Sequence, residues 1–210
     1  MQVTEIFFSI QGEGSRAGRP CVFVRFTGCD LRCAYCDTAY AFQGGQPMSR
    51  QEILAEVGRH PSRFVCLTGG EPLLQAELPA LARELLDRGY EVAVETHGQR
   101  PLGALPAEVV RIADVKTPGS GEVATDLAYL EGLGPRDEVK FVVCSEDDFR
   151  WSLEVIRRHR LEGRMEVLLS PSHGQVDPRD LARWMLESGV QARLNLQIHK
   201  VLWGADARGV

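Results

Sequence analysis

The sequence lacks the features that would place the protein in a membrane or on nucleic acid. No run approaches the roughly 18 apolar residues that a membrane-spanning helix needs. The N-terminal stretch MQVTEIFFSIQGEGS has neither the basic segment nor the small-residue cleavage site of a signal peptide. Basic residues are not in excess, because the formal net charge is −5. We therefore expect a cytoplasmic protein with no direct nucleic-acid or membrane partner.

Cysteine is also scarce, and half of it is concentrated in one place. Of six cysteines, Cys29, Cys33 and Cys36 all lie in the stretch CDLRCAYCDTAY. In a reducing compartment, clustered thiols are more often metal ligands or catalysts than disulfides. A C-x3-C-x2-C loop can hold an iron–sulfur cluster through three thiolates and leave one iron open to another ligand. Such an open position distinguishes catalytic from structural metal sites.

Zinc is the main alternative for these thiols. His97, or less readily Cys21, would complete a four-ligand site with the three clustered cysteines, as in a structural zinc-binding module. Cys66 and Cys144 lie in or beside apolar runs, where a free cysteine behaves as a small hydrophobic residue. The two alternatives differ in a simple observation, since a zinc protein is colourless and an iron–sulfur protein is brown and oxygen-sensitive.

The rest of the chain alternates between apolar runs and helical periodicity, which predicts an α/β fold with a mostly parallel sheet. Predicted strands span 22–26, 64–68, 90–95, 109–115, 138–143, 165–169 and 192–198. Predicted helices span 49–58, 76–88, 147–160 and 178–187. The 210 residues fall short of the roughly 250 of a full eight-stranded barrel. We predict a single domain, 1–210, built as a partial, open and shortened βα barrel of about six or seven mostly parallel strands.

Two motifs in order carry a resemblance to radical S-adenosylmethionine (SAM) enzymes. The cluster loop, 29–36, has an aromatic residue, Tyr35, before its last cysteine, and Gly69-Gly70-Glu71-Pro72 follows the predicted strand 64–68. The resemblance implies a 4Fe-4S cluster whose open iron is chelated by SAM. It also implies chemistry that begins when a 5′-deoxyadenosyl radical abstracts a substrate hydrogen.

Longer stretches resemble one family within that superfamily, over essentially the whole chain. These are EIFFSIQGEGSRAGRPCVFVRFTGC, CDTAY and the C-terminal LQIHKVLWGADARGV, which are similar to 7-carboxy-7-deazaguanine synthases. The resemblance implies a lyase that converts 6-carboxy-5,6,7,8-tetrahydropterin to 7-carboxy-7-deazaguanine and ammonia, for queuosine and deazapurine biosynthesis. It further implies Mg²⁺, a homodimer and an electron donor such as flavodoxin or ferredoxin. An activase that makes a glycyl radical on another protein is the rival within the superfamily.

The family resemblance also indicates which residues bind the substrate. An amide and a carboxylate suit the donor–acceptor edge of a pterin, and an arginine suits its carboxylate. Arg25 alternates with Val24 and Phe26 on a predicted strand, so its side chain can face the site. The predicted substrate residues are Ile10, Gln11, Gly12, Glu13, Arg25, Thr68, His199 and Val210, with the C-terminal tail closing over the substrate. Lys200 is a further candidate beside His199, which alone is more often structural.

Cofactor ligands follow from the same resemblance. Thr38 matches a position that binds Mg²⁺ through its hydroxyl, although a threonine there is also a common turn residue. The residues expected to bind SAM are Tyr35, Asp37, Gly70, Glu95, Val115, Lys116, Thr117, Ser170, Pro171, Ser172 and His173. No residue is assigned as a general acid or base, because the reaction begins with hydrogen abstraction.

Overall fold

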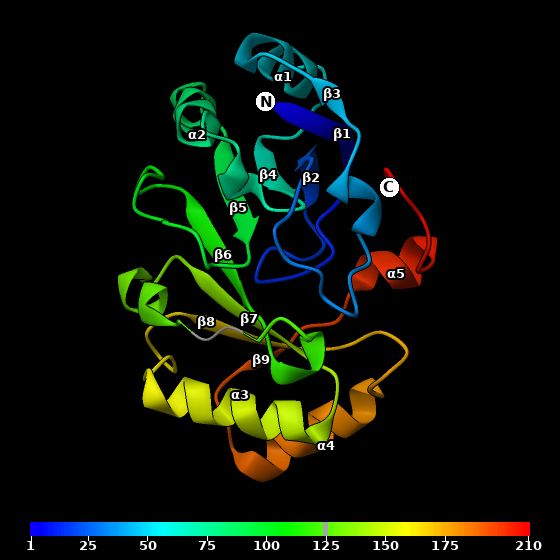
Figure 1. The fold of residues 1–210 in the computed structure, drawn as a ribbon, viewed down its shortest axis with the longest axis vertical. Helices are drawn as coiled ribbons and strands as arrows, with labels where there is room; N and C mark the ends of the chain where they lie inside the picture. The colour runs from blue at the N-terminus through cyan, green and yellow to red at the C-terminus, as the bar shows by residue number, and fades with distance from the viewer. Residues whose placement is uncertain (124–125) are drawn as a thin grey trace.

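A computed structural model describes residues 1–123 and 126–210, and its nine strands form one curved sheet in the order β3-β1-β2-β4-β5-β6-β7-β8-β9 (Figure 1). The parallel strands are β2 (Pro20–Phe26), β4 (Phe64–Gly69), β5 (Glu91–Thr96), β6 (Val110–Val115), β7 (Glu138–Val143), β8 (Glu166–Pro171) and β9 (Arg193–Leu194). Each of these seven overlaps a predicted strand, so the partial, mostly parallel barrel is confirmed.

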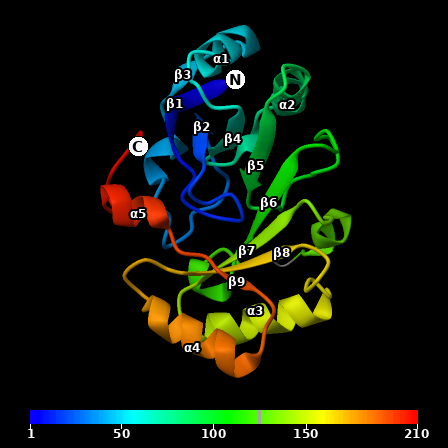
Figure 2. The ribbon, with the colours of Figure 1, turned by 180° about the vertical axis from the view of Figure 1, so that it is seen from behind.

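Helices cover the outer face of this sheet in two groups. Figures 1 and 2 show α1 (Arg50–Val57) and α2 (Leu78–Asp87) at one end of the molecule, and α3 (Glu146–Arg158) and α4 (Pro178–Ser188) at the other. Each group packs on its own apolar cluster of buried residues. The 3-10 helices are η1 (Ala39–Phe42), η2 (Pro72–Leu74), η3 (Pro118–Ser120) and η4 (Ala128–Gly132).

Helix ends follow the local sequence. The side chain of Ser49 accepts from the backbone N–H of Glu52, whose carboxylate in turn accepts from the Ser49 N–H, so α1 begins in a complete capping box. α4 ends at Gly189, which adopts φ +69° in the left-handed region that glycine tolerates best.

The inner face of the barrel has an apolar floor and a polar upper level. Strand side chains alternate between the faces, so every second residue points inward. The floor is a separate buried cluster made by Cys21, Phe23, Phe64, Cys66, Ala93, Val110 and Ile112, with Phe7 packed against it. One step further along the same strands, the inward positions are Arg25, Thr68, Glu95 and Asp114. Such charged residues need partners at this depth, and the partners define the site described below.

Two strands were not predicted. β1 (Gln2–Ile10) pairs antiparallel with β2, and β3 (Gln46–Pro47) pairs antiparallel with β1 at the edge of the sheet. The β1 sequence, QVTEIFFSI, holds adjacent phenylalanines and lacks clean alternation, because this strand is largely half-buried rather than enclosed on one face.

The prediction of a strand over 192–198 is wrong beyond its first residues. β9 holds only Arg193–Leu194, and a short helix, α5 (Ile198–Trp203), follows it. The strand stops because the Asn195 side chain donates to Ser170 Oγ at 2.7 Å and accepts from the Gly14 N–H at 2.7 Å. The Ile198 N–H then donates to the Gly12 carbonyl, which draws the chain over the loop that follows β1.

Across the described residues, no helix has the length and apolar character of a membrane span.

Candidate active site

A cavity of about 710 Å³ opens at the carboxyl ends of the parallel strands, where the active sites of βα barrels form. Its volume lies within the range of about 300–1,000 Å³ that is usual for ligand sites. The cluster loop, the strand ends, the loop after β1 and the C-terminal residues 205–210 all contribute to its walls. Residues from the N-terminal, central and C-terminal parts of the chain therefore meet at one site.

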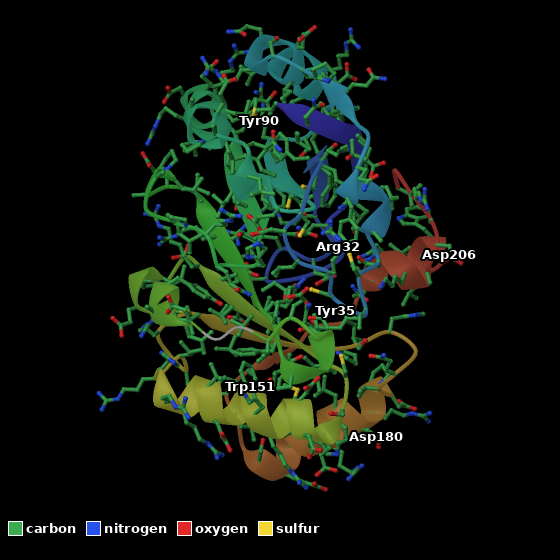
Figure 3. The ribbon with its side chains drawn as sticks, in the orientation of Figure 1. Arg32, Tyr35, Tyr90, Trp151, Asp180 and Asp206 are labelled. Atoms are coloured by element: carbon green, nitrogen blue, oxygen red, sulfur yellow. The ribbon has the colours of Figure 1, made fainter. Side chains whose placement is uncertain are left out.

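The three cysteines of the cluster loop all face this cavity and are partly exposed. Burial raises the pKa of each thiol above its ordinary value, and the positive charge of Lys116 offsets this only in part for Cys33 and Cys36. Figure 3 labels two other residues of the loop, Arg32 and Tyr35, near the centre of the molecule between the two helix groups.

Polar contacts hold the cluster loop against the rest of the barrel. Asp30, which follows the first cysteine, accepts from Arg100 at 2.7 Å and lies 3.0 Å from Nε2 of the buried His97. On the other side of the loop, the Ala34 N–H donates to the Ser120 carbonyl at 2.8 Å, and the Arg32 N–H donates to Glu122 at 2.9 Å. Contacts within the protein therefore hold the loop on both sides.

The Gly-Gly-Glu-Pro motif allows the end of β4 to approach this loop closely. Gly69 has φ +147°, and a Cβ there would lie 2.3 Å from the Phe26 carbonyl oxygen. A Cβ on Gly70 would lie 2.0 Å from the carbonyl oxygen of Gly28. Glu71 is fully buried and accepts from Thr96 Oγ1 and from backbone N–H groups, so its carboxylate supports the turn and does not reach the cavity.

The donor set fits an iron–sulfur cluster better than a single zinc ion. Within residues 1–123 and 126–210, no three Cys, His, Asp or Glu side chains converge closely enough to ligate one ion. The irons of a cluster occupy separate corners, so its three thiolates need not meet at one point. The fourth ligands of the zinc alternative are also engaged elsewhere: His97 lies between Asp30 and Glu71, and Cys21 is in the buried floor.

A hydrogen-bonded group of polar side chains lies directly above the apolar floor of the cavity. Glu95 accepts from Gln11 Nε2 at 3.2 Å and from Thr68 Oγ1 at 3.0 Å. Both donors are residues predicted to bind substrate, whereas Glu95 itself was predicted to bind SAM. The structure thus places Glu95 within the group of residues predicted to bind substrate.

Glu13 occupies a second, more strongly charged group. It accepts from Lys140 at 2.9 Å and Asn195 at 3.2 Å on one oxygen, and from Gln197 at 2.7 Å on the other. Burial alone would raise its pKa, but Lys140 and the donated hydrogen bonds hold that pKa below the ordinary value. Glu13 is therefore an ionised carboxylate.

Arg25 points inward, as predicted, and its Nε donates to Glu5 at 2.8 Å. Tyr40 donates to the same Glu5 oxygen at 2.7 Å, and the Arg208 guanidinium lies 4.3 Å from the centre of the Tyr40 ring. This stack joins the C-terminal tail to the wall that carries Arg25. Figure 3 labels Asp206 of the same tail, beside α5.

Asp37 and His199 complete the rim. Burial would raise the pKa of Asp37, but Lys200, at 2.9 Å, brings it down to about 2. Thr38 donates to Asp37 at 3.0 Å. Burial lowers the pKa of His199. Its ring packs against Gly12 so closely that a Cβ on Gly12 would lie only 2.0 Å from the Nδ1 atom of His199. At neutral pH His199 is an uncharged imidazole packed on the loop after β1.

All but two of the predicted site residues line this one cavity. Those that do are Cys29, Cys33, Cys36, Thr38, Tyr35, Asp37, Gly70, Glu95, Lys116, Ser170, Pro171, Ser172, His173, Ile10, Gln11, Gly12, Glu13, Arg25, Thr68, His199 and Val210. Val115 and Thr117 do not, because they alternate with the inward-facing Asp114 and Lys116 on β6 and beyond it. The Thr117 hydroxyl instead donates to the Val142 carbonyl at 2.8 Å and is fully buried.

Sequence reasoning missed several charged residues of the cavity. Asp114, Lys140, Glu5 and Tyr40 were not singled out, although all but Glu5 line it. The signal was present for two of them, because Asp114 and Lys140 interrupt the apolar runs RIADV and EVKFVV at period-two positions. A charge inside a buried strand points to a polar interior.

Comparison with known proteins agrees with this geometry. Residues 23–164 match the Radical SAM superfamily. The chain is 46% identical to a 7-carboxy-7-deazaguanine synthase of Koribacter versatilis over 100% of both chains. It is 42% identical to one of Chlorobaculum tepidum over 100% of this chain and 97% of that one. The crystal structure of QueE from Escherichia coli shares the fold, with a TM-score of 0.77 and 24% identity over 93% of each chain. The chain therefore belongs to the 7-carboxy-7-deazaguanine synthase family of the radical SAM superfamily.

Proposed function

We propose that this protein converts 6-carboxy-5,6,7,8-tetrahydropterin to 7-carboxy-7-deazaguanine with release of ammonia. The observation that carries the proposal is the shared cavity: the three cluster cysteines and the Gln11–Glu95–Thr68 group line the same cavity. A cluster-binding loop alone would fit any radical SAM enzyme, whereas the amide, carboxylate and hydroxyl of this group suit the polar edge of a pterin.

The residues divide into those that hold the cofactors and those that hold the substrate. Cys29, Cys33 and Cys36 would ligate the 4Fe-4S cluster, which with SAM supplies the 5′-deoxyadenosyl radical when both are bound. Tyr35, Gly70 and the other cavity-lining residues predicted above would bind SAM. We retain Thr38 as the proposed Mg²⁺ ligand through its hydroxyl, with substrate oxygens and water completing the shell.

Substrate binding follows from the charges that line the cavity. The Nε of Arg25 is engaged by Glu5, which leaves both terminal nitrogens of the guanidinium to bind the substrate carboxylate side by side. Gln11 and Glu13 would read the pterin ring, and the tail residues up to Val210 would close over it and exclude water.

The proposed cellular setting rests on the same chemistry. A cluster held by thiolates needs reduced cysteines, which supports the prediction of a cytoplasmic enzyme. The radical reaction needs one electron at a time, so we propose a flavodoxin or ferredoxin as donor. We also propose the homodimer that the family resemblance implies.

The decisive experiment is an anaerobic assay of the reconstituted protein with SAM, reductant, Mg²⁺ and the carboxytetrahydropterin. We expect the deazaguanine product and one equivalent of ammonia. Cleavage of SAM without product would refute the substrate assignment but retain the superfamily, and would make the glycyl-radical activase the next candidate. Cys33→Ala is the matched control, since it should abolish both SAM cleavage and product.

A further inference from the structure

Lysine is rare in this chain, and every lysine lines the cavity. Of the 24 lysine and arginine residues, only Lys116, Lys140 and Lys200 are lysines, and all other basic positions are arginine. Their side chains are only 12%, 13% and 9% exposed. The basic residues on the surface are therefore arginines, and the three lysine side chains all lie in the cavity.

Each of these lysines is paired with a carboxylate that also lines the cavity. Lys116 lies 3.0 Å from Asp114, and Lys200 lies 2.9 Å from Asp37. Lys140 is the central one, because it lies 2.9 Å from Glu13 and 3.4 Å from Asp114. These are two acids that come from different elements, the loop after β1 and strand β6.

The strands fix the position of Lys140. Lys140 lies directly opposite Asp114 in the register of β6 and β7, and both side chains face the interior. Its neighbours Val139 and Phe141 face outward into the core under α3. The ammonium therefore projects from a rigid strand, and the loop that carries Glu13 is drawn onto it.

An ammonium suits this place better than a guanidinium does. Lys140 bridges two carboxylates as a compact point charge whose three N–H donors diverge. A guanidinium is larger and planar, and it binds one carboxylate best in a side-by-side geometry. At position 140 it would extend into the cavity or push Glu13 away from its other two donors, Asn195 and Gln197.

We propose that Lys140 is a positioning residue that keeps Glu13 ionised and fixed in the orientation in which it reads the substrate ring. This inference rests on the proposed function, since it takes Glu13 as a substrate-binding residue. The other titratable groups that face Glu13 are Asp37, which directly follows the cluster loop, and His199 of α5. Neither can replace Lys140, because Asp37 is itself an acid and burial keeps His199 uncharged.

Two substitutions separate the charge of Lys140 from its shape. K140M removes the charge, and K140R keeps the charge but changes the shape. Arg150→Lys on the exposed face of α3 is the matched control, since it exchanges the same two cations in a surface pair with Glu146. For each variant we would measure thermal unfolding, iron content, SAM cleavage without substrate, and KM and kcat for the carboxytetrahydropterin.

We expect K140R to raise KM by roughly 10- to 100-fold, as expected for a misplaced hydrogen bond to a charged group. Iron content and substrate-free SAM cleavage should stay within about twofold of wild type, and K140M should raise KM at least as much as K140R. R150K should match wild type in every measurement. A K140R enzyme with wild-type KM, or one that loses iron and SAM cleavage in proportion to turnover, would overturn the inference.

A second measurement does not depend on the substrate. In ¹³C-glutamate-labelled protein, the carboxyl resonance of Glu13, assigned with E13Q, should show an ionised group at neutral pH in wild type and K140R. In K140M this resonance should titrate at a higher pH than in wild type, because burial is then opposed only by the hydrogen bonds from Asn195 and Gln197. An unchanged titration of Glu13 in K140M would refute the role of Lys140 even if the wild-type protein made no deazaguanine. Failure of the wild-type assay alone would refute only the proposed function.

Discussion

Replacing Gly70 with alanine tests how tightly the end of β4 packs against the cluster loop. The added Cβ would lie 2.0 Å from the carbonyl oxygen of Gly28 and 3.0 Å from the Cβ of Cys29. Neither neighbour can move aside by changing a rotamer, because one is backbone and the other begins the cluster loop. The Gly28 carbonyl also accepts from the Glu71 N–H at 2.7 Å, and this bond must lengthen when the loop shifts.

The cost of G70A can be estimated from these two effects. Overpacking by one methyl group costs about 1–3 kcal/mol, and losing a backbone hydrogen bond costs about 1 kcal/mol more. The docked arrangement of the cluster loop should therefore be weakened by about 2–4 kcal/mol, which corresponds to a factor of roughly 30 to 1,000 in its population.

The assay is anaerobic cluster reconstitution, with iron and sulfide per chain and the visible absorbance of the cluster as readouts. We expect G70A to bind well under half the wild-type iron and to lose its cluster faster in air. Gly103→Ala is the control, because a Cβ there meets nothing within 4 Å. A G70A protein with a full, stable cluster and unchanged thermal unfolding would refute the close packing that the structure shows at this turn.

Two further changes probe the residues around the site. Thr117→Val removes a buried hydroxyl that donates to the Val142 carbonyl, so we expect unfolding to become easier by about 1–3 kcal/mol in urea titrations while SAM affinity stays the same; a large loss of SAM affinity without loss of stability would instead place Thr117 in the SAM site. The second change is Lys200→Met. Because the folded pKa of Asp37 is about 2, below its ordinary value of 3.8, the Asp37–Lys200 pair stabilises the fold above about pH 4 and loses that effect as the pH falls towards 2. The difference in unfolding free energy between wild type and K200M should therefore be present at pH 5 and vanish near pH 2, and a difference that is independent of pH would contradict the pairing.

The parallel strands other than β9 were predictable because each one is largely buried on both faces. The run VFVRF and its counterparts pack one face on helices and the other on the barrel floor, which leaves a nearly continuous apolar pattern. β1 has no such pattern, since it lies beside the edge strand β3 and is half-buried along most of its length. Local sequence cannot distinguish such a strand from a loop, because tertiary pairing determines its conformation.

Strand alternation and local backbone geometry also decide which of the predicted site residues line the cavity. The cysteines and glycines of the two short motifs line it, because the backbone geometry they need is encoded locally. The run of Val115, Lys116 and Thr117 was predicted as a continuous SAM-binding segment, but strand alternation sends only Lys116 inward. The pairing of Lys140 with Glu13 joins residues 127 positions apart, so no local pattern could reveal it.

The loop after β1 explains how a barrel with too few strands encloses its substrate. The sheet is open, with β3 at one edge and β9 at the other, and the loop packs across the space beside β9. Gly14 binds Asn195 just after β9, Ser15 and Arg16 bind Glu138 at the base of β7, and Gly12 accepts from Ile198 of α5. The contacts that close the barrel are thus made by the residues on either side of Glu13. The same loop closes the wall and holds Glu13, the carboxylate that we propose reads the substrate. A substitution that loosens the loop should therefore weaken substrate binding before it unfolds the protein.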